Sequence, residues 1–384
     1  MRVTIVGYEG MNSNNSNLYN IAKCLQRKDY LYRMLCPHFS QKCEIQAEKI
    51  IQEGNISRGL HAALLLSWHY FSRKIPERYL NETLFDNFAQ RKIPTDSDVL
   101  LCTDGGLVHT IRKAKKNGVP TIVLLRTPHP TYLYNILSQE SSRFGTWDDS
   151  IFTNKNWVLN RNITLDECDE IFVKSEIVKE SCIREGVRPE KITVIKSGVG
   201  VDTTYYRRGA HKGKEFTCLF IGHKSLLNGV PYLLEAWKMV NPNTGKLIIC
   251  GAQNQKLIQK YKEIINFDAP GIVSNPLAYY QSATIFVLPS LVNSFPRVVL
   301  EAMSCELPVI ISEGVGSKVL IDDGKEGFIV PVRDAKAIAE KIQYFIDNPD
   351  EVTRMGKNAR KKVESYSWPS FCDEVITKIK EIMN

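Results

Sequence analysis

The segment from Thr284 to Ser312 constrains the fold of this chain more than any other. It contains two short runs rich in β-branched residues, TIFVLPS and PVIIS, with a helical pattern between them. Runs of this kind are typical of parallel strands that are buried on both faces. The segment therefore predicts an α/β protein built around a parallel sheet.

The helix between these two runs should begin at a proline and contain one acidic residue. Ser294 is a residue type that caps helices, and Pro296 is tolerated in a first turn, where backbone N–H groups lack helical partners. The N–H groups of Arg297 and Val298 would then form an anion site at the positive end of the helix dipole. Glu301 lies in the otherwise apolar run VVLEAM, where a carboxylate is costly unless a polar group pairs with it.

Length and composition indicate a soluble protein of two domains. The 384 residues are too many for one ordinary core, and 43% hydrophobic with 24% charged residues is typical of globular proteins. The longest apolar run, HAALLLSW, is far shorter than the ~20 residues needed to span a bilayer. The N-terminal MRVTIVGYEG enters a strand directly, without the apolar region of a signal peptide.

Cysteine usage and charge bear on the compartment and the partners. The 10 cysteines are scattered singly, which indicates reduced thiols in a cytoplasmic protein rather than disulfides or a zinc site. The net charge of +8 fits an anionic substrate or a weak attraction to an acidic membrane surface, and equally a solvated basic surface. A basic run such as KCLQRKDYLYR is interpreted as helical. It is either a site of peripheral membrane attachment or a solvated face of a helix. No nucleic-acid partner is expected.

Strand and helix patterns alternate through both halves of the chain. In the first half, strands are expected at 2–7, 98–104, 120–127, 170–175 and 191–198, and helices at 18–27, 106–118, 132–143, 163–169 and 177–185. The pattern over 41–90 is helical, and 199–216 is a polar, basic linker. In the second half, strands are expected at 216–222, 246–252, near 272 and at 327–332, and helices at 229–240, 257–265, 276–283, 334–348, 350–366 and 368–383. The predicted architecture is two doubly wound α/β domains in tandem, facing across a cleft.

Neither half carries the glycine fingerprint of a dinucleotide site. Gly7 and Gly10 follow the first strand but are succeeded by asparagines, so a Rossmann dehydrogenase is not expected. His129 follows the strand at 120–127, at the carboxyl end where open α/β sheets bind ligands. It is either a ligand-binding residue or an ordinary, satisfied polar residue. Asp96 and Asp98 precede a strand and are interpreted as a loop rather than as a metal site.

The second half resembles the nucleotide-binding domain of the retaining glycosyltransferases of family 4, which have the GT-B architecture. The matching pieces are LFIGHKSLLNGVPYLLEAW, NPLAYYQSATIFVLPS, NSFPRVVLEAMSCELPVIIS and IDDGKEGFIVPVRD, in the family's order. The first half matches more weakly, through EIFVKSEIVKESCIREGVRPEKITVIKSGVGVD and the unit ending at RTPHP. The resemblance implies an acceptor-side Rossmann-like domain at 1–205, a nucleotide-sugar domain at 206–366, and a C-terminal helix at 367–384 that crosses back to the first domain.

The resemblance also implies a donor site around the family's pair of glutamates. Glu301 matches the second glutamate, which accepts hydrogen bonds from the ribose hydroxyls; the alternative for Glu301 is a salt bridge to a nearby Lys or Arg. The first glutamate, which contacts the transferred sugar, is replaced here by Asn293. This change removes a negative charge but keeps a hydrogen-bonding carbonyl, and implies either altered sugar selection or loss of catalysis. The backbone N–H groups of Phe295 and Arg297 would hold sugar hydroxyls or phosphate, whereas Pro296 donates none.

The phosphate clamp of the family is also altered. In the segment GHKSLLNG, which begins at Gly222, His223 takes the position of the family's arginine and Asn228 that of its lysine. Lys224 then remains as the firm cation, or is simply exposed to solvent, with Arg297 as a substitute for the lost charge. Val273 matches the position whose backbone contacts the base.

In the first domain, the resemblance assigns two further positions. His129 matches a residue that touches the donor sugar near the reaction centre, and Gly10 lies in the loop that approaches the donor phosphate or the acceptor. The implied donor is a UDP- or GDP-sugar, and the acceptor is a glycan, a lipid-linked molecule or a small molecule. No metal cofactor is expected, and transfer should retain the configuration of the sugar.

Two functions from different classes remain open on these residues. The first is a metal-independent, retaining hexosyltransferase. The second is a catalytically impaired subunit that binds a sugar nucleotide or a glycan, which the replacements at Asn293, His223 and Asn228 would favour.

Overall fold

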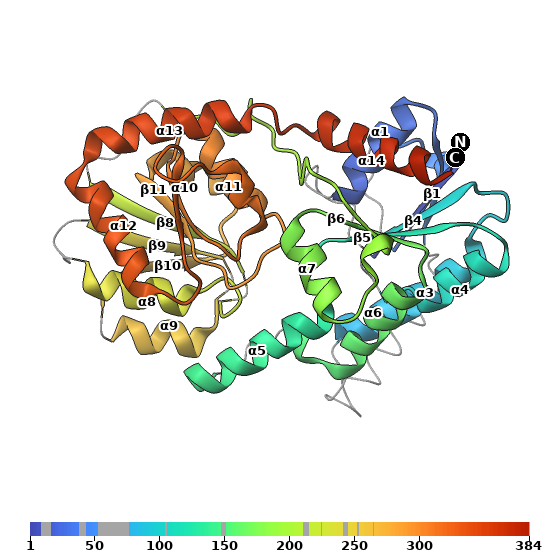
Figure 1. Ribbon diagram of the computed structural model, residues 1–384, viewed down its shortest axis with the longest axis horizontal. Coiled ribbons are helices and arrows are strands. Elements are labelled where there is room, and N and C mark those ends of the chain that lie inside the picture. Colours follow the sequence, from blue (N-terminus) through green and yellow to red (C-terminus); the bar gives the residue numbers. More distant parts are fainter. Residues whose placement is uncertain are drawn as a thin grey trace.

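The computed structural model describes residues 1–8, 17–37, 44–52, 77–103, 106–146, 151–209, 215–223, 225–240, 245–251, 253–263 and 265–383. Within these ranges the chain forms two parallel sheets, one of seven strands and one of six (Figure 1). Each sheet lies in its own lobe with helices on both faces, as the alternating pattern predicted. The prediction of two doubly wound α/β domains is confirmed.

The sheet of the first domain has the strand order β3-β2-β1-β4-β5-β6-β7. Because a helix or a long connection separates successive strands, neighbouring strands can all run parallel. The strands are β1 (Val3–Val6), β2 (Leu31–Cys36), β3 (Ile50–Gln52), β4 (Val99–Thr103), β5 (Thr121–Leu125), β6 (Glu170–Val173) and β7 (Ile192–Val194). The helices are α1 (Asn17–Arg27), α3 (Glu77–Lys92), α4 (Val108–Lys116), α5 (Pro130–Phe144), α6 (Lys155–Glu167) and α7 (Glu176–Arg184), with short 3-10 turns at Ala47–Lys49, Ile151–Thr153 and Pro189–Lys191.

The second sheet repeats the same winding, with the order β10-β9-β8-β11-β12-β13. Its strands are β8 (Phe216–Ile221), β9 (Gly245–Cys250), β10 (Asp268–Gly271), β11 (Ile285–Leu288), β12 (Val309–Ser312) and β13 (Gly327–Val330). Its helices are α8 (Val230–Met239), α9 (Gln255–Lys262), α10 (Pro276–Ser282), α11 (Arg297–Ser304), α12 (Ala335–Asp347) and α13 (Pro349–Val363), with the 3-10 turn η4 at Gly316–Leu320. The βαβ unit predicted from the sequence is β11–α11–β12, and its two strands pair in parallel.

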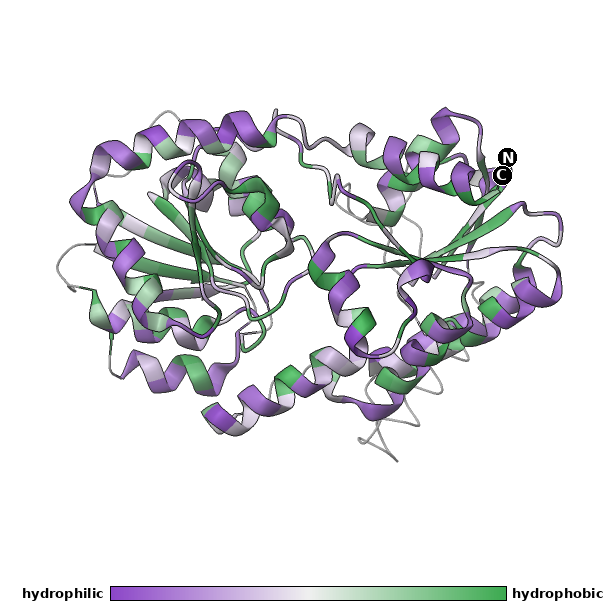
Figure 2. Cartoon of the chain, viewed as in Figure 1, coloured by the Kyte–Doolittle hydropathy of each residue, from purple (hydrophilic) through white to green (hydrophobic). Residues whose placement is uncertain are grey.

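Apolar strands form the centre of each lobe, and polar residues cover the outer faces of the helices (Figure 2). The residues of β1, β4, β5, β11 and β12 are all buried, which is the pattern expected of strands covered on both faces. Among the described residues, no helix combines the length and apolar character that crossing a bilayer requires.

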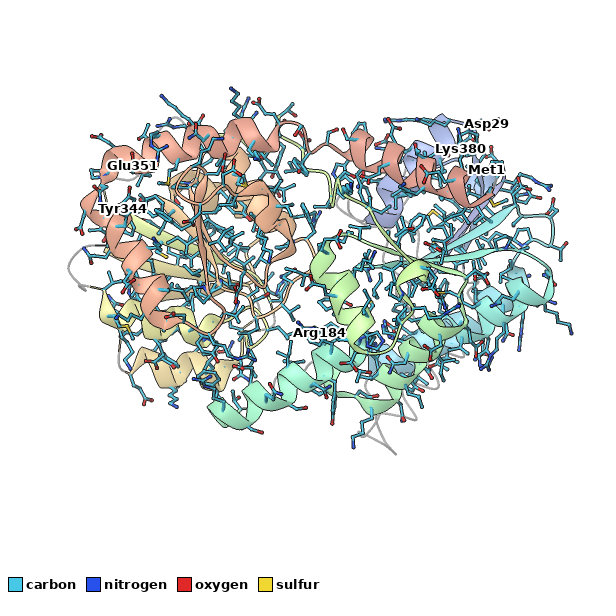
Figure 3. All side chains as sticks on the ribbon, in the orientation of Figure 1. Met1, Asp29, Arg184, Tyr344, Glu351 and Lys380 are labelled. Carbon is cyan, nitrogen blue, oxygen red and sulfur yellow. The ribbon has the colours of Figure 1, made fainter. Side chains whose placement is uncertain are left out.

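The last helix, α14 (Trp368–Met383), leaves the second domain and packs on the first, as Figure 1 shows. Phe371, Val375 and Ile379 join the same core cluster as residues of β1 and α1. Lys380 places its charge 4.8 Å from the ring centroid of Tyr30, and Figure 3 shows it beside Met1 and Asp29 at the N-terminal end of the chain. The predicted return of the C-terminal helix is confirmed, whereas the exact boundaries after residues 205 and 366 stay predictions.

Two sequence interpretations were wrong in the first domain. The helical pattern over 41–90 contains β3, which pairs with β2 in parallel, and only α3 within the described part is an α-helix. The run KCLQRKDYLYR is not one helix, because α1 ends at Arg27 and β2 begins at Leu31. Asp29 has φ of +57° in the turn between them. A three-residue strand is too short to show a period, so its pairing with a neighbour decided the conformation.

Candidate functional site

A cavity of about 210 Å³ lies between the two domains, at the carboxyl ends of β5, β8 and β11. The first domain contributes the segment after β5 and one residue of α5, and the second domain contributes the loops after β8 and β11. The lining residues are Arg126, Thr127, Pro128, Leu133, His223, Leu227, Asn228, Val292, Asn293 and Ser294. The carboxyl edge of a doubly wound sheet is where such folds bind ligands. This cavity is therefore the candidate site.

A larger cavity of about 550 Å³ lies at the other edge of the second sheet. Its lining includes Glu215, Gly245 and Asp268, which stand at or next to the first residues of β8, β9 and β10. These are the amino ends of the strands, so size alone does not make this cavity the better candidate.

The two asparagines that replace the family's charged residues contact each other at the candidate site. Asn293 Nδ2 donates to Asn228 Oδ1 over 3.1 Å, and Ser290 Oγ donates to the same oxygen over 3.0 Å. Asn228 Nδ2 in turn donates to the carbonyl of His223. Three of the four hydrogen-bonding positions of the Asn228 amide are thus used within the protein. The His223 side chain is exposed at the cavity.

The backbone of Asn293 is held from the opposite side by the turn that follows β12. Its N–H donates to the carbonyl of Gly314 over 2.9 Å, and its carbonyl accepts from the N–H of Gly316 over 2.8 Å. These bonds tie the loop between β11 and α11 to the turn after β12. The position of Asn293 therefore depends on both β11 and β12.

Helix α11 starts differently from the prediction. Pro296 is itself the N-cap, with φ of −72° and ψ of 121°, and no side chain caps the helix. The buried Ser294 Oγ has no hydrogen-bond partner within the described part of the chain. The prediction that Ser294 caps this helix was wrong, because the N-cap position falls on Pro296, two residues later in the chain. Arg297 and Val298 are the first two helical residues, as the anion-site prediction requires.

Glu301 is buried on α11, with 6% of its surface exposed, and its partners are tyrosine hydroxyls. Tyr280 on α10 donates to Glu301 Oε2 over 2.9 Å, and Tyr206 in the interdomain linker donates a further hydrogen bond. Burial raises the pKa of the Glu301 carboxyl, while the charge of Arg297, one turn earlier, and the tyrosine hydroxyls oppose that rise. The polar partner that the sequence reading required is therefore present. Glu301 is not among the residues that line the cavity.

The other predicted residues of the second domain surround this region. Phe295 is buried, and its ring packs against Gly198 and stacks on Tyr366, 6.3 Å away, so its side chain joins the linker to the end of α13. Gly222 directly follows β8, and its N–H donates to the carbonyl of Cys250 over 3.0 Å. Val273, two residues after β10, is half-buried against the core.

His129 is the N-cap residue of α5 and is buried, with 4% of its surface exposed. Its N–H donates to Ser181 Oγ over 2.9 Å, and its Nδ1 atom has no hydrogen-bond partner among the described residues. Burial lowers the pKa of the imidazole to about 4, so the ring is neutral at pH 7. Its chain neighbours Thr127 and Pro128 line the cavity, whereas His129 does not.

Two predicted residues, Gly10 and Lys224, lie outside the described residues. Sequence reasoning in turn missed the first-domain wall of the cavity, above all Arg126 and Leu133. A signal was available, because the run TIVLLRT places the charged Arg126 at the carboxyl edge of the sheet.

The chain is similar in sequence to known glycosyltransferases. Residues 202–362 match the family model of the glycosyl transferases group 1. A capsular polysaccharide biosynthesis glycosyltransferase, CapM of Staphylococcus aureus, is 27% identical over 234 residues, which cover 56% of this chain and 60% of CapM. A D-inositol 3-phosphate glycosyltransferase of Corynebacterium kroppenstedtii is 26% identical over 235 residues, covering 54% of this chain and 52% of that protein. The chain thus spans roughly half to three-fifths of these relatives.

Solved structures share the fold over nearly the whole chain. Sucrose-phosphate synthase from Thermosynechococcus elongatus superimposes with a TM-score of 0.72 at 16% identity, covering 99% of each chain. Anabaena Alr3699/HepE in complex with UDP has a TM-score of 0.66 at 14% identity, covering 99% of this chain and 100% of that one. At these identities the likeness concerns the fold, which is the GT-B arrangement. The chain therefore shares the fold of these solved structures, and its residues 202–362 match the model of the glycosyl transferases group 1.

Proposed function

We propose that this protein is a retaining glycosyltransferase that moves a hexose-type sugar from a UDP- or GDP-sugar to a hydroxyl group. The acceptor would be a glycan, a lipid-linked molecule or a small molecule, and no metal would take part. The observation that carries the proposal is the cavity at the carboxyl ends of both sheets, lined by polar groups from both domains of a group 1 fold. Related folds have been solved with UDP, with UDP-glucose, and with UDP beside a glycan.

In this proposal the protein acts by positioning the reactants and by binding the leaving group. Glu301, held by the two tyrosine hydroxyls, would accept hydrogen bonds from the ribose through its remaining lone pairs. Asn293 would present its amide to the transferred sugar from a backbone anchored to the turn after β12. The acceptor hydroxyl would attack on the face that the diphosphate leaves, and the leaving phosphate oxygen would take its proton.

The test combines binding with turnover. Purified protein is screened by thermal shift against UDP-glucose, UDP-galactose, UDP-N-acetylglucosamine and GDP-mannose, since a bound donor raises the melting temperature. Hydrolysis or transfer of the stabilising donor is then followed by NMR, with EDTA present in a parallel sample. We expect an α-configured product from an α-configured donor and no effect of EDTA. If none of these donors raises the melting temperature or turns over, the proposal is wrong.

The same experiment separates the enzyme from a sugar-nucleotide-binding subunit. A subunit would bind a donor tightly and release no sugar or nucleoside diphosphate with any acceptor or with water.

A further inference from the structure

The described wall of the cavity contains one side chain with a permanent charge, and that side chain belongs to the first domain. Of the lining residues, Arg126 is charged, while the second domain contributes amides, a hydroxyl, apolar groups and His223. A nucleoside diphosphate carries its negative charge on the two phosphates, which proteins bind with cations and N–H groups. Among the described lining residues, the Arg126 side chain is thus the one whose charge is complementary to a diphosphate.

The second domain has no cation at the position where the family resemblance implies a lysine. Asn228 occupies that position, and its amide is engaged by Ser290, Asn293 and the carbonyl of His223. Asn293 is neutral as well, so the replacement of both residues removes one positive and one negative charge together. The change keeps the balance of charge at these two positions and removes the cation that the resemblance implies at one of them.

Arg126 lies close to a second arginine, Arg161. Its positive neighbour Arg161 is already paired with Glu82, over 2.9 and 3.1 Å, and stacks on Trp157 at 3.6 Å from the ring centroid. Burial and the charge of Arg161 lower the pKa of the Arg126 guanidinium to about 10, so it stays charged at pH 7. An anion in the cavity would reduce the repulsion between the two arginines.

The segment that carries Arg126 is also attached to the second domain. Helix α5 begins four residues after Arg126, and near its end the buried Glu140 accepts from Tyr232 Oη and from Arg333 Nε, each over 2.7 Å. Asn254 Nδ2 donates across the same interface to Thr146 Oγ1 over 2.9 Å. The α5 attachment, meaning these contacts of Glu140 and Thr146, joins the Arg126 wall to the second domain.

We propose that Arg126 binds the diphosphate of the donor from the first-domain side, and that the α5 attachment holds it in reach. This inference rests on the proposed function. It places a phosphate-binding cation on the first domain, so the diphosphate is fully bound only when the two domains are docked.

The test compares a ligand with phosphates and a ligand without them. UDP and uridine, or GDP and guanosine if the donor screen selects GDP, are titrated by calorimetry into the wild type and into Arg126→Gln, Arg126→Lys and Arg188→Gln. Arg188 is the matched control, because it is in the same domain and its side chain is 75% exposed. We expect Arg126→Gln to weaken UDP binding at least tenfold with uridine binding unchanged. Arg126→Lys should lie between Arg126→Gln and the wild type, and Arg188→Gln should match the wild type.

Each outcome decides between the two proposals. A wild type that binds neither UDP nor GDP overturns the proposed function, and this inference with it. If the wild type binds UDP and Arg126→Gln binds it equally well, the role of Arg126 is wrong while the proposed function stands. An equal loss of UDP and uridine binding in Arg126→Gln would also contradict the phosphate-binding role, since such a loss indicates that Arg126 only supports the structure of the site. Melting temperatures establish that the variants are folded; if Arg126→Gln is not, the same comparison is made with Arg126→Lys.

Discussion

Glu301 and His129 are both buried ionisable side chains, and burial shifts both toward their neutral forms. The pKa of Glu301 rises above its ordinary 4.5, and that of His129 falls from 6.5 to about 4. Their effects on stability as the pH changes therefore differ, and each can be measured by itself.

The Glu301 carboxylate lowers stability at neutral pH, because its folded pKa is raised. The folded protein holds the proton more tightly than the unfolded chain, so the stability associated with Glu301 falls as pH rises from 4.5 through the folded pKa. Glu301→Gln keeps the acceptor oxygen for Tyr280 and removes the charge. We expect the variant to be at least as stable as the wild type at pH 7 in chemical denaturation, and to lose donor binding at least tenfold. A less stable variant at pH 7 would contradict this account of burial.

The stability linked to His129 changes with pH in the opposite direction, because the pKa of His129 is lowered in the folded protein. Stability linked to the neutral imidazole is fully present above pH 6.5 and is lost as pH falls toward the folded pKa of about 4. One group contributes a slope of at most about 1.4 kcal/mol per pH unit in this window. His129→Gln should remove that slope between pH 6 and pH 4.5 in urea unfolding. The control is His109→Gln, which changes an exposed histidine on α4. An unchanged slope in His129→Gln would show that the ring is not the responsible group.

At the scale of elements, the site depends on short turns that the strands hold together. The turn after β12 supplies two backbone hydrogen bonds to Asn293, and η4, which begins in this turn, lies close to the first domain. A Cβ at Gly316 would overlap the carbonyl oxygen of Ser294 and lie 2.5 Å from Ser175 Oγ on the first domain.

Gly316→Ala should therefore disturb both the β11–α11 loop and the contact between the domains. A backbone carbonyl cannot rotate away as a long side chain can, so we expect a loss of about 1–3 kcal/mol of stability and weaker donor binding. The control is Gly324→Asn, at a glycine with φ of +79° and open space around it, where asparagine is tolerated. Thermal unfolding and donor titration measure both effects; an unaltered Gly316→Ala would show that η4 can shift at no cost.

Sequence patterns identified the longer elements but missed the shortest ones. The unit β11–α11–β12 was predicted because its strands are buried on both faces and its helix lies between them. β3 was missed because three residues carry no period, and the capping role of Ser294 was assigned wrongly because the helix begins only after Pro296.

At the scale of the whole molecule, two connections among the described residues join the domains in addition to the linker and the contact of η4. One is α14, whose Glu374 accepts hydrogen bonds from the N–H groups of Lys196 and Ser197, each over 2.8 Å. The other is the α5 attachment, in which Glu140 has 2% of its surface exposed and pairs with Arg333. A buried carboxylate between two partners is sensitive to the loss of either one.

Glu140→Ala should loosen the docking of the two domains without unfolding either. Arg333 and Tyr232 would lose their partner, so we expect a larger radius of gyration in small-angle scattering and weaker donor binding. The control is Glu340→Ala, since that carboxylate has a 62% exposed side chain and lies 3.8 Å from Lys336. A Glu140→Ala protein with unchanged scattering and binding would show that α5 does not hold the domains together.

The sequence by itself determined the alternation of strands and helices, the parallel unit at Thr284 to Ser312, and the need of Glu301 for a polar partner. These follow from periodicity and from the cost of burying charge, both of which act over a few residues. Only the tertiary structure decided that the partner is Tyr280, that Asn228 pairs with Asn293, and that a first-domain arginine lines the cavity. Such pairs join residues that are far apart in the chain, 193 positions apart for Glu140 and Arg333, and their choice depends on how sheets and domains pack.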